Sequence, residues 1–180
     1  MGKGGPVFIG PVFIGLGANL DSPVHGPPRA TCEAALAALA AAGVRILRRA
    51  RWYRSAPVPS SDQPWFVNGV AEVAADLAPA ELLARLHAVE DAFGRVRRDR
   101  DEARVLDLDL LAHGDRVDDG LGNGGAGGGP VLPHPRLHLR AFVLLPLCEL
   151  APDWVHPVLG RTARDLAADL PPDQVAEPLE

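Results

Sequence analysis

The segment that most constrains this chain is the alternation of leucine and aspartate at residues 106–111, which reads Leu-Asp-Leu-Asp-Leu-Leu. A period of two is typical of a strand that is buried on one face, so Leu106, Leu108 and Leu110 are predicted to point into a core. Asp107 and Asp109 would then share the opposite face, about 7 Å apart by the rise of a strand. The segment therefore predicts a strand that carries two carboxylates side by side.

This pattern needs an explanation, because like charges on one strand face repel each other and Asp is a poor strand former. One explanation is a solvated polar face on an edge strand. The other is a shared cation, since Mg²⁺ prefers oxygen ligands and is commonly held by one or two carboxylates together with substrate phosphates. Both interpretations stay open from these residues alone, and the second predicts a magnesium site for a nucleotide.

Length and composition predict one domain over residues 1–180. The chain is 47% hydrophobic and 23% charged, as in an ordinary globular domain. Its net charge of −5 argues against nucleic acid as a partner. The basic residues are unevenly placed, however, and a short stretch before the acidic strand has the charge to bind an anion (Arg95, Arg97, Arg98, Arg100 and Arg104).

The cysteines and the first residues favour a cytoplasmic protein without membrane contact. Cys32 and Cys148 lie far apart and outside any Cys-x-x-Cys pattern, so two buried thiols and no disulfide are expected. The apolar run from Pro6 to Leu20 is interrupted by glycine and proline and is too short to span a bilayer.

The N-terminal region contains the letters Gly-Pro-Val-Phe-Ile-Gly twice in succession, at residues 5–10 and 10–15. One copy fills a strand, which we predict at Val12–Leu16, and residues 1–11 are interpreted as a duplicated or extra segment. Gly15-Leu-Gly17 would then form a sharp turn out of that strand. A dinucleotide-binding fingerprint is the weaker alternative, because the third glycine and the following helix are missing.

The remaining pattern predicts an α+β fold. In chain order it indicates a helix at 30–42, a strand at 44–53, a proline-rich loop at 55–64, a strand at 65–74, a helix at 79–93 and the acidic strand. This order matches a ferredoxin-like α/β sandwich, with a central antiparallel sheet flanked by helices. A short strand near 117 and helices at about 142–147 and 162–170 follow.

Two further motifs are given structural interpretations. The glycine-rich segment within 118–130 lacks the Lys, the Ser or Thr and the helix start of a phosphate-binding loop, so a flexible surface loop is expected. His134 and His138 have the spacing of a zinc pair, but Pro135 lies between them at a helix entry, which makes a shared face improbable.

Several motifs together resemble the 6-hydroxymethyl-7,8-dihydropterin pyrophosphokinase family, in the family's order and over about Phe13 to Trp154. They are Tyr53-Arg-Ser-Ala-Pro57, Asp62-Gln-Pro-x-Phe66-x-Asn68, Phe93-Gly-Arg95-x-Arg97, Arg104-x-Leu-Asp107-Leu-Asp109 and Leu-Pro-His134-Pro-Arg-x-His138-x-Arg140-x-Phe142. The resemblance implies a monomeric enzyme of folate biosynthesis. Such an enzyme moves a diphosphoryl group from ATP to the hydroxymethyl oxygen of the pterin and releases AMP.

The resemblance also implies roles for individual residues. Asp107 and Asp109 would hold two Mg²⁺ ions, and Arg95 and Arg104 would act in catalysis with them. ATP would be bound by Glu90, Arg97, Arg104, Leu110, His134 and Arg140. The pterin would be bound by Ser55, Ala56, Val58, Phe66, Asn68 and Phe142, with the two phenylalanines on either face of its rings.

The chain departs from the family pattern in the loop before Arg104. Relatives usually carry a Trp-Gly pair there, whereas this chain has Asp101-Glu102-Ala103. The loop from Arg95 to Arg104 is therefore expected to close over bound nucleotide by charge more than by burial.

Two other functions compete with this one. Another magnesium-nucleotide transferase with an Asp-x-Asp strand, acting for instance on a sugar nucleotide, would release a nucleoside diphosphate instead of AMP. A ferredoxin-like ligand-sensing module would have no need of a carboxylate pair that shares a metal.

Overall fold

The computed structural model describes residues 10–74, 76–94, 103–121 and 129–179. In chain order the first elements are β1 (Val12–Ala18), α1 (Pro28–Ala41), β2 (Arg45–Arg49), β3 (Tyr53–Ser55), β4 (Phe66–Ala74), α2 (Pro79–Ala92) and β5 (Asp107–His113). After it come β6 (Asp118–Asp119), β7 (Val131–Leu132), a 3-10 turn (Leu137–Leu139), α3 (Ala141–Leu150), α4 (Ala163–Ala168) and β8 (Ala176–Pro178).

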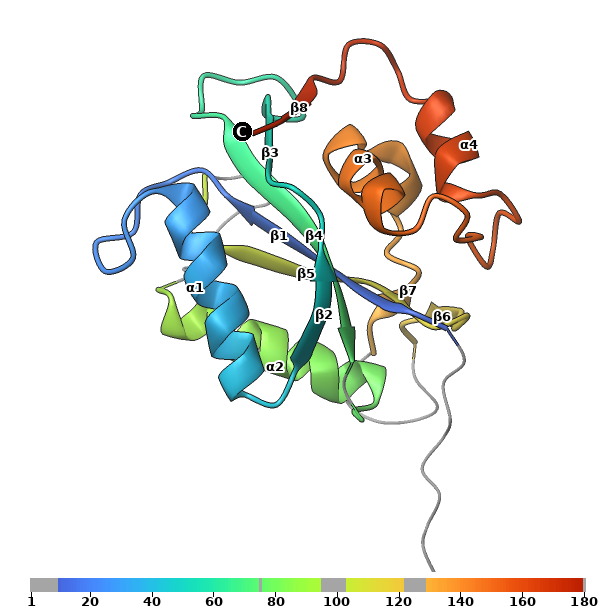
Figure 1. The fold of residues 1–180 in the computed structure, drawn as a ribbon, viewed down its shortest axis with the longest axis horizontal. Helices are drawn as coiled ribbons and strands as arrows, with labels where there is room; N and C mark the ends of the chain where they lie inside the picture. Colours follow the sequence, from blue (N-terminus) through green and yellow to red (C-terminus); the bar gives the residue numbers. More distant parts are fainter. Residues whose placement is uncertain (1–9, 75, 95–102, 122–128, 180) are drawn as a thin grey trace, which may run out of the picture.

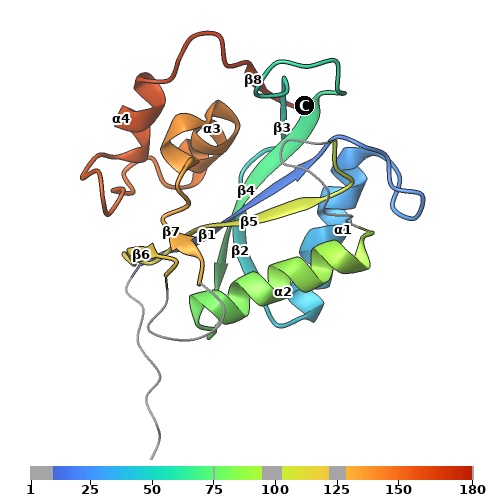
Figure 2. The same ribbon diagram turned by 180° about the vertical axis from the view of Figure 1, so that it is seen from behind.

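The main sheet has the order β5-β1-β4-β3-β8, with β2 also paired to β4, and every pair in it is antiparallel. The acidic strand β5 is thus next to β1, as the ferredoxin-like order requires. Helices α1 and α2 cover one face of the sheet, and α3 and α4 cover the other (Figures 1 and 2). The predicted α+β fold with a central antiparallel sheet is confirmed.

The sheet separates two hydrophobic cores. Leu106, Leu108 and Leu110 are 0%, 1% and 3% exposed and belong to the core under α1 and α2. Phe13 and Leu111 point the other way and pack with the apolar side chains of α3 and α4. The period-two interpretation of the acidic strand is therefore confirmed, and its aspartates lie on the face that α3 partly covers.

The prediction of one continuous strand at 44–53 is wrong, because the structure has two separate strands there, β2 and β3. The pairing of β2 with β4 shifts register between Ile46 and Arg48, and the strand ends before Trp52. Trp52 then packs against the bare backbone of Gly69, where a Cβ atom would lie 2.6 Å from its ring. Trp52 is 2% exposed, so the break between the two strands coincides with the entry of a large aromatic side chain into the core.

The strand predicted at Val12–Leu16 is longer in the structure and contains the predicted turn glycines. Gly15 and Gly17 pair in register with β4 on one side and β5 on the other, so they remain inside β1. The first copy of the repeated hexapeptide lies almost wholly outside the described residues.

Two other expectations are tested by the described residues. Cys32 and Cys148 are both free, as predicted, although Cys148 is only partly buried. Within the described ranges, none of the helices has the length and apolar character needed to cross a bilayer.

Candidate active site

The floor of the candidate site is the stretch of β1 that carries no side chains on the α3 face. In the sheet register Gly17 lies between Asp107 of β5 and Asn68 of β4, and Gly15 lies opposite Asp109. A Cβ atom at residue 17 would come within 3.1 Å of the Asn68 Oδ1 atom. Glycine at these positions therefore leaves a hollow between the acidic strand and the polar side chain of β4.

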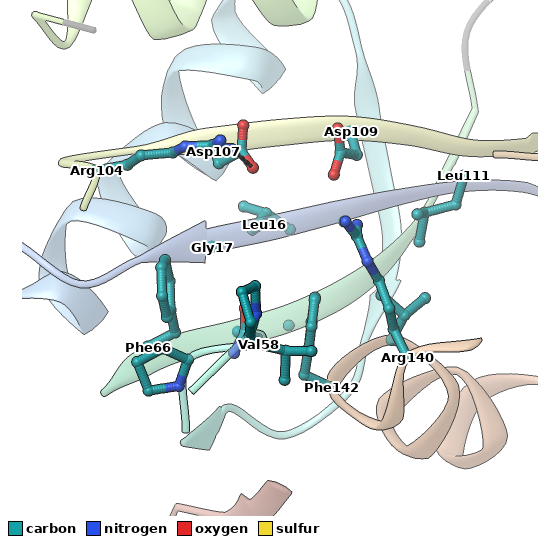
Figure 3. A pocket seen from close by; sticks show the side chains of 16 residues that line it. Leu16, Gly17, Val58, Phe66, Arg104, Asp107, Asp109, Leu111, Arg140 and Phe142 are labelled. Atoms are coloured by element: carbon teal, nitrogen blue, oxygen red, sulfur yellow. Dashed lines mark hydrogen bonds and ion pairs between the residues drawn. The ribbon is translucent and has the colours of Figure 1, made fainter. Parts of the chain in front are cut away.

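A pocket occupies this hollow and collects residues from distant parts of the chain (Figure 3). Its walls come from β5, β4, the start of α3 and the proline-rich loop at 57–59. Eight of the residues proposed from the sequence line it: Val58, Phe66, Asn68, Arg104, Asp107, Asp109, Arg140 and Phe142. The structure thus brings both halves of the predicted site together, while the roles of these residues stay predictions.

The upper wall carries the charges. Asp107 and Asp109 are both partly buried, and their carboxylates lie on the same side of β5 (Figure 3). The Arg104 Nη1 atom donates to the Asp107 Oδ2 atom at 2.6 Å. Arg140 extends from the start of α3 toward β1, with its guanidinium carbon 5.3 Å from the centroid of the Phe142 ring (Figure 3). Carboxylates that can bind a cation therefore lie beside guanidinium groups that can bind phosphate.

The opposite wall is aromatic and contains one buried amide. Phe66 begins β4 and Phe142 lies in the first turn of α3, and both rings face the pocket across from the aspartates (Figure 3). Asn68 is 4% exposed, and its Nδ2 atom donates to the Ser55 Oγ atom at 2.7 Å. Ser55 thereby fixes the side chain of Asn68, whose Oδ1 atom lies over Gly17. The wall offers flat apolar surfaces and a directed hydrogen-bonding group.

Three residues predicted to bind ATP do not line the pocket. Glu90 of α2 is fully buried, and its Oε1 atom accepts the Leu108 backbone N–H at 2.6 Å. The Leu110 side chain is in the core under α1 and α2. The backbone N–H of His134 donates to the Leu111 carbonyl oxygen at 2.8 Å. Their contacts with nucleotide stay predictions.

The pKa of His134 is lowered by its burial and by nearby arginines. Burial lowers the pKa of His134 to about 4, and the guanidiniums of Arg140 and Arg136 act in the same direction. Its Nδ1 atom accepts the Arg136 backbone N–H at 3.2 Å. The imidazole is therefore neutral at physiological pH.

The remaining predicted residues are outside the pocket lining or outside the described part of the chain. Ser55 and Ala56 do not line the pocket; the Ser55 hydroxyl accepts the bond from Asn68, and the Ala56 N–H donates to the Val175 carbonyl oxygen at 3.2 Å. Arg95 and Arg97 lie outside the described residues, as do Asp101 and Glu102.

The donor set fits magnesium better than zinc. In the ranges that the structure describes, no group of three or more His, Cys, Asp or Glu side chains could hold a metal ion. His138, the second histidine of the possible zinc pair, packs its ring against that of His156, and the two ring centroids are 5.7 Å apart. Two carboxylates on one strand face suit a Mg²⁺ ion that takes its other ligands from water and substrate phosphates.

Sequence reasoning missed the function of Gly15 and Gly17 and the contacts of Asn19. The role of the glycines could have been predicted, because Gly15 and Gly17 alternate with Ile14 and Leu16. In a strand, this alternation places both glycines on one face, which then carries no side chains. Asn19 gave no such signal. It is 3% exposed and bonds to residues that are far away in the sequence.

The chain is similar to known proteins over most of its length. The family model described as 7,8-dihydro-6-hydroxymethylpterin-pyrophosphokinase (HPPK) matches residues 13–152. A protein of Synechocystis is 40% identical over 83% of this chain and 70% of its own length. One from Pseudomonas aeruginosa is 40% identical over 89% of this chain and 91% of its own length. Both are described as 2-amino-4-hydroxy-6-hydroxymethyldihydropteridine pyrophosphokinase.

Solved structures support the fold. A Plasmodium falciparum HPPK-DHPS structure matches with a TM-score of 0.65 at 12% identity, over 88% of this chain and 45% of that chain. Another structure, of HPPK-DHPS in complex with substrates, matches with a TM-score of 0.63, over 88% of this chain and 43% of that one. The chain therefore spans less than half the length of these proteins, and at such identity the likeness concerns the fold alone.

Proposed function

Since the chain belongs to the 7,8-dihydro-6-hydroxymethylpterin-pyrophosphokinase family, we propose that its pocket moves a diphosphoryl group from ATP to 6-hydroxymethyl-7,8-dihydropterin. The acceptor is the hydroxymethyl oxygen, and the products are AMP and the pterin diphosphate of folate biosynthesis. One observation carries the proposal: a single pocket joins a carboxylate pair and two arginines to two phenylalanines and a buried amide.

The charged wall suits the triphosphate. Asp107 and Asp109 would hold Mg²⁺, in our proposal two ions, which when bound neutralise phosphate charge. Arg104 and Arg140 each present a planar fork of donors that meets phosphate oxygens two bonds at a time. Arg104 already bonds Asp107 at 2.6 Å, so its guanidinium is held at the edge of the carboxylate pair before nucleotide arrives.

The aromatic wall suits the pterin. Phe66 and Phe142 would contact the two faces of the flat bicycle, for which offset ring stacking is favourable. Asn68 would bond to the polar edge, since its amide is buried and its orientation is set by Ser55. Backbone groups from Ser55 to Val58 would complete that edge. The hydroxymethyl group of a pterin held in this way would point toward the aspartates.

Transfer of a phosphoryl-type group depends mainly on positioning and charge stabilisation, which are the contributions that this pocket offers. The protein brings the acceptor oxygen and the phosphates together and supplies positive charge from Arg104 and Arg140. Arg95 and Arg97 are proposed to add to this charge from the loop before Arg104. The proposal includes a monomeric enzyme that occupies residues 1–180 as one domain.

The test is an assay with ATP, Mg²⁺ and 6-hydroxymethyl-7,8-dihydropterin, in which nucleotide products are separated by chromatography. We expect AMP in equal amount to the pterin diphosphate, and loss of both when Mg²⁺ is chelated. Formation of ADP instead would contradict the proposal and favour a simple phosphotransferase. Tight pterin binding without any turnover would favour the ligand-sensing module.

A further inference from the structure

Asn19, directly after β1, is buried and bonds through both ends of its side-chain amide. Its Oδ1 atom accepts the Arg104 backbone N–H at 2.6 Å. Its Nδ2 atom donates to the Pro64 carbonyl oxygen at 3.0 Å and, at 3.4 Å, to the Gln63 Oε1 atom. The amide therefore joins two segments that are 40 residues apart from each other in sequence.

The two segments belong to different halves of the pocket. Arg104 lies three residues before Asp107, and its guanidinium bonds that aspartate at 2.6 Å. Pro64 lies two residues before Phe66, at the end of the proline-rich loop that also contributes Val58. Asn19 itself does not line the pocket, so any effect that it has on substrates acts through these neighbours.

Neither anchoring point is held by the sheet. Arg104 precedes the start of β5 and Pro64 precedes the start of β4. The Arg104 carbonyl oxygen accepts the backbone N–H groups of Asn19 and Leu20, at 2.9 and 3.1 Å. Together with the side-chain bond, this occupies both polar backbone groups of Arg104 with the segment around Asn19. The end of β1 thus determines where the start of the acidic segment lies.

A satisfied buried amide can also serve stability alone. The Asn19 amide differs from a purely structural one in what it joins. Its Oδ1 atom holds the segment before Asp107, and its Nδ2 atom holds the segment before Phe66, so it connects the two proposed halves of the pocket. We propose that Asn19 is a positioning residue, which sets the distance between the phosphate half and the pterin half of the pocket. This inference rests on the proposed function, and it adds a residue to which no role had been given.

Two substitutions separate the two ends of the amide. Asn19→Asp keeps an oxygen for the Arg104 N–H but replaces the donor to Pro64 with an acceptor, so only the pterin side should loosen. Asn19→Ala removes both bonds. Since one hydrogen bond contributes on the order of 1 kcal/mol, Asn19→Asp should raise the pterin KM by about five- to tenfold and leave the ATP KM within about twofold. Asn19→Ala should raise both KM values and lower kcat.

Ser22→Ala is the matched control. Ser22 is 6% exposed, and its hydroxyl accepts the Val24 and His25 N–H groups within the same loop. It should lower the melting temperature and leave both KM values unchanged. If Asn19→Asp behaves like Ser22→Ala, or raises both KM values equally, Asn19 is only structural and the inference is wrong.

A measurement on the unaltered protein decides the matter even if the Asn19 variants do not fold. Hydrogen exchange of the Arg104 amide should slow when 6-hydroxymethyl-7,8-dihydropterin binds alone, because a fixed pterin loop fixes the Asn19 side chain. Slowing only after an ATP analogue is added would overturn the inference. An unaltered protein that releases no AMP would contradict the proposed function instead, so the two failures are distinguishable.

Discussion

At the scale of single residues, the carboxylate pair is not symmetric. Asp107 is bonded to Arg104, and both side chains are about one-fifth exposed, at 20% and 23%. Asp109 has a different neighbour in the register, since it lies opposite Gly15 and Asp107 lies opposite Gly17. A partly exposed ion pair contributes up to about 1 kcal/mol, so loss of the bond between Asp107 and Arg104 should cost the fold only a small part of its stability.

Replacement of either aspartate by asparagine tests the proposed metal site. Asp107→Asn and Asp109→Asn should each lower kcat/KM by at least about a hundredfold, because the proposed cation would lose a charged ligand. Asp107→Asn should also lower the free energy of unfolding by up to about 1 kcal/mol, because it weakens the ion pair with Arg104. Asp115→Asn, on an exposed turn, is the control. Activity within tenfold of normal in both site variants would refute the metal assignment.

Burial of His134 should make the stability of the fold depend on pH. Its pKa is about 4 in the folded chain and about 6.5 in the unfolded chain, so the unfolded chain binds more protons between these values. Stability should therefore fall as the pH decreases from about 6.5 to 4, by on the order of 1–3 kcal/mol from this residue. Above pH 6.5 its effect should be constant.

The measurement is urea unfolding of the unaltered protein and of His134→Asn across this pH range. Burial also lowers the pKa values of His113 and His156, so both proteins should lose stability in acid. The difference between them isolates His134, and equal slopes would show that its imidazole is not held neutral by the fold.

At the scale of elements, the bare face of β1 makes the site available. The two floor glycines differ in what an added methyl group would meet. At residue 17 it would lie 3.1 Å from the Asn68 Oδ1 atom, whereas at residue 15 the three nearest atoms all belong to the Leu111 side chain, at 3.4 to 3.6 Å. The first contact is tight and polar, and the second is an ordinary van der Waals contact.

Gly17→Ala should therefore raise the Kd for pterin by about tenfold or more, because it displaces the buried amide that would bond to the pterin edge. Gly15→Ala is the matched control and should leave pterin binding nearly unchanged. Calorimetric titration with pterin measures both. Equal effects of the two substitutions would mean that loss of space on the floor, and not the position of Asn68, controls binding.

Some of the strands and contacts could be predicted from the sequence alone, and others could not. The acidic strand was predictable because Leu106, Leu108 and Leu110 follow a strict period of two. The break between β2 and β3 was not, because the register shift after Ile46 depends on pairing with β4 and on space for Trp52 over Gly69. The Asn19 contacts could not be predicted either, since its partners lie 45 and 85 residues away and are brought near only by the fold.

At the scale of the whole molecule, the sheet gives the protein two cores with different relations to the site. The core under α1 and α2 lies behind the pocket floor. The core under α3 and α4 lies beside the pocket, and α3 carries Phe142 in its first turn and follows directly after Arg140. Loosening of the second core should therefore move the residues that are proposed to bind ligands, while loosening of the first should mainly cost stability.

Two leucines that are both 0% exposed, one in each core, allow a matched comparison: Leu147 of α3 and Leu86 of α2. Substitution of either by alanine should destabilise the fold by about 2–5 kcal/mol, since each leaves a cavity. Measured well below the melting temperature, Leu147→Ala should also weaken pterin and ATP binding by several-fold, because α3 can shift on the sheet. Leu86→Ala should bind both ligands normally once the folded fraction is taken into account. The prediction would be contradicted if both variants bound the ligands more weakly in proportion to their loss of stability. In that case α3 would have no separate role in positioning the pocket.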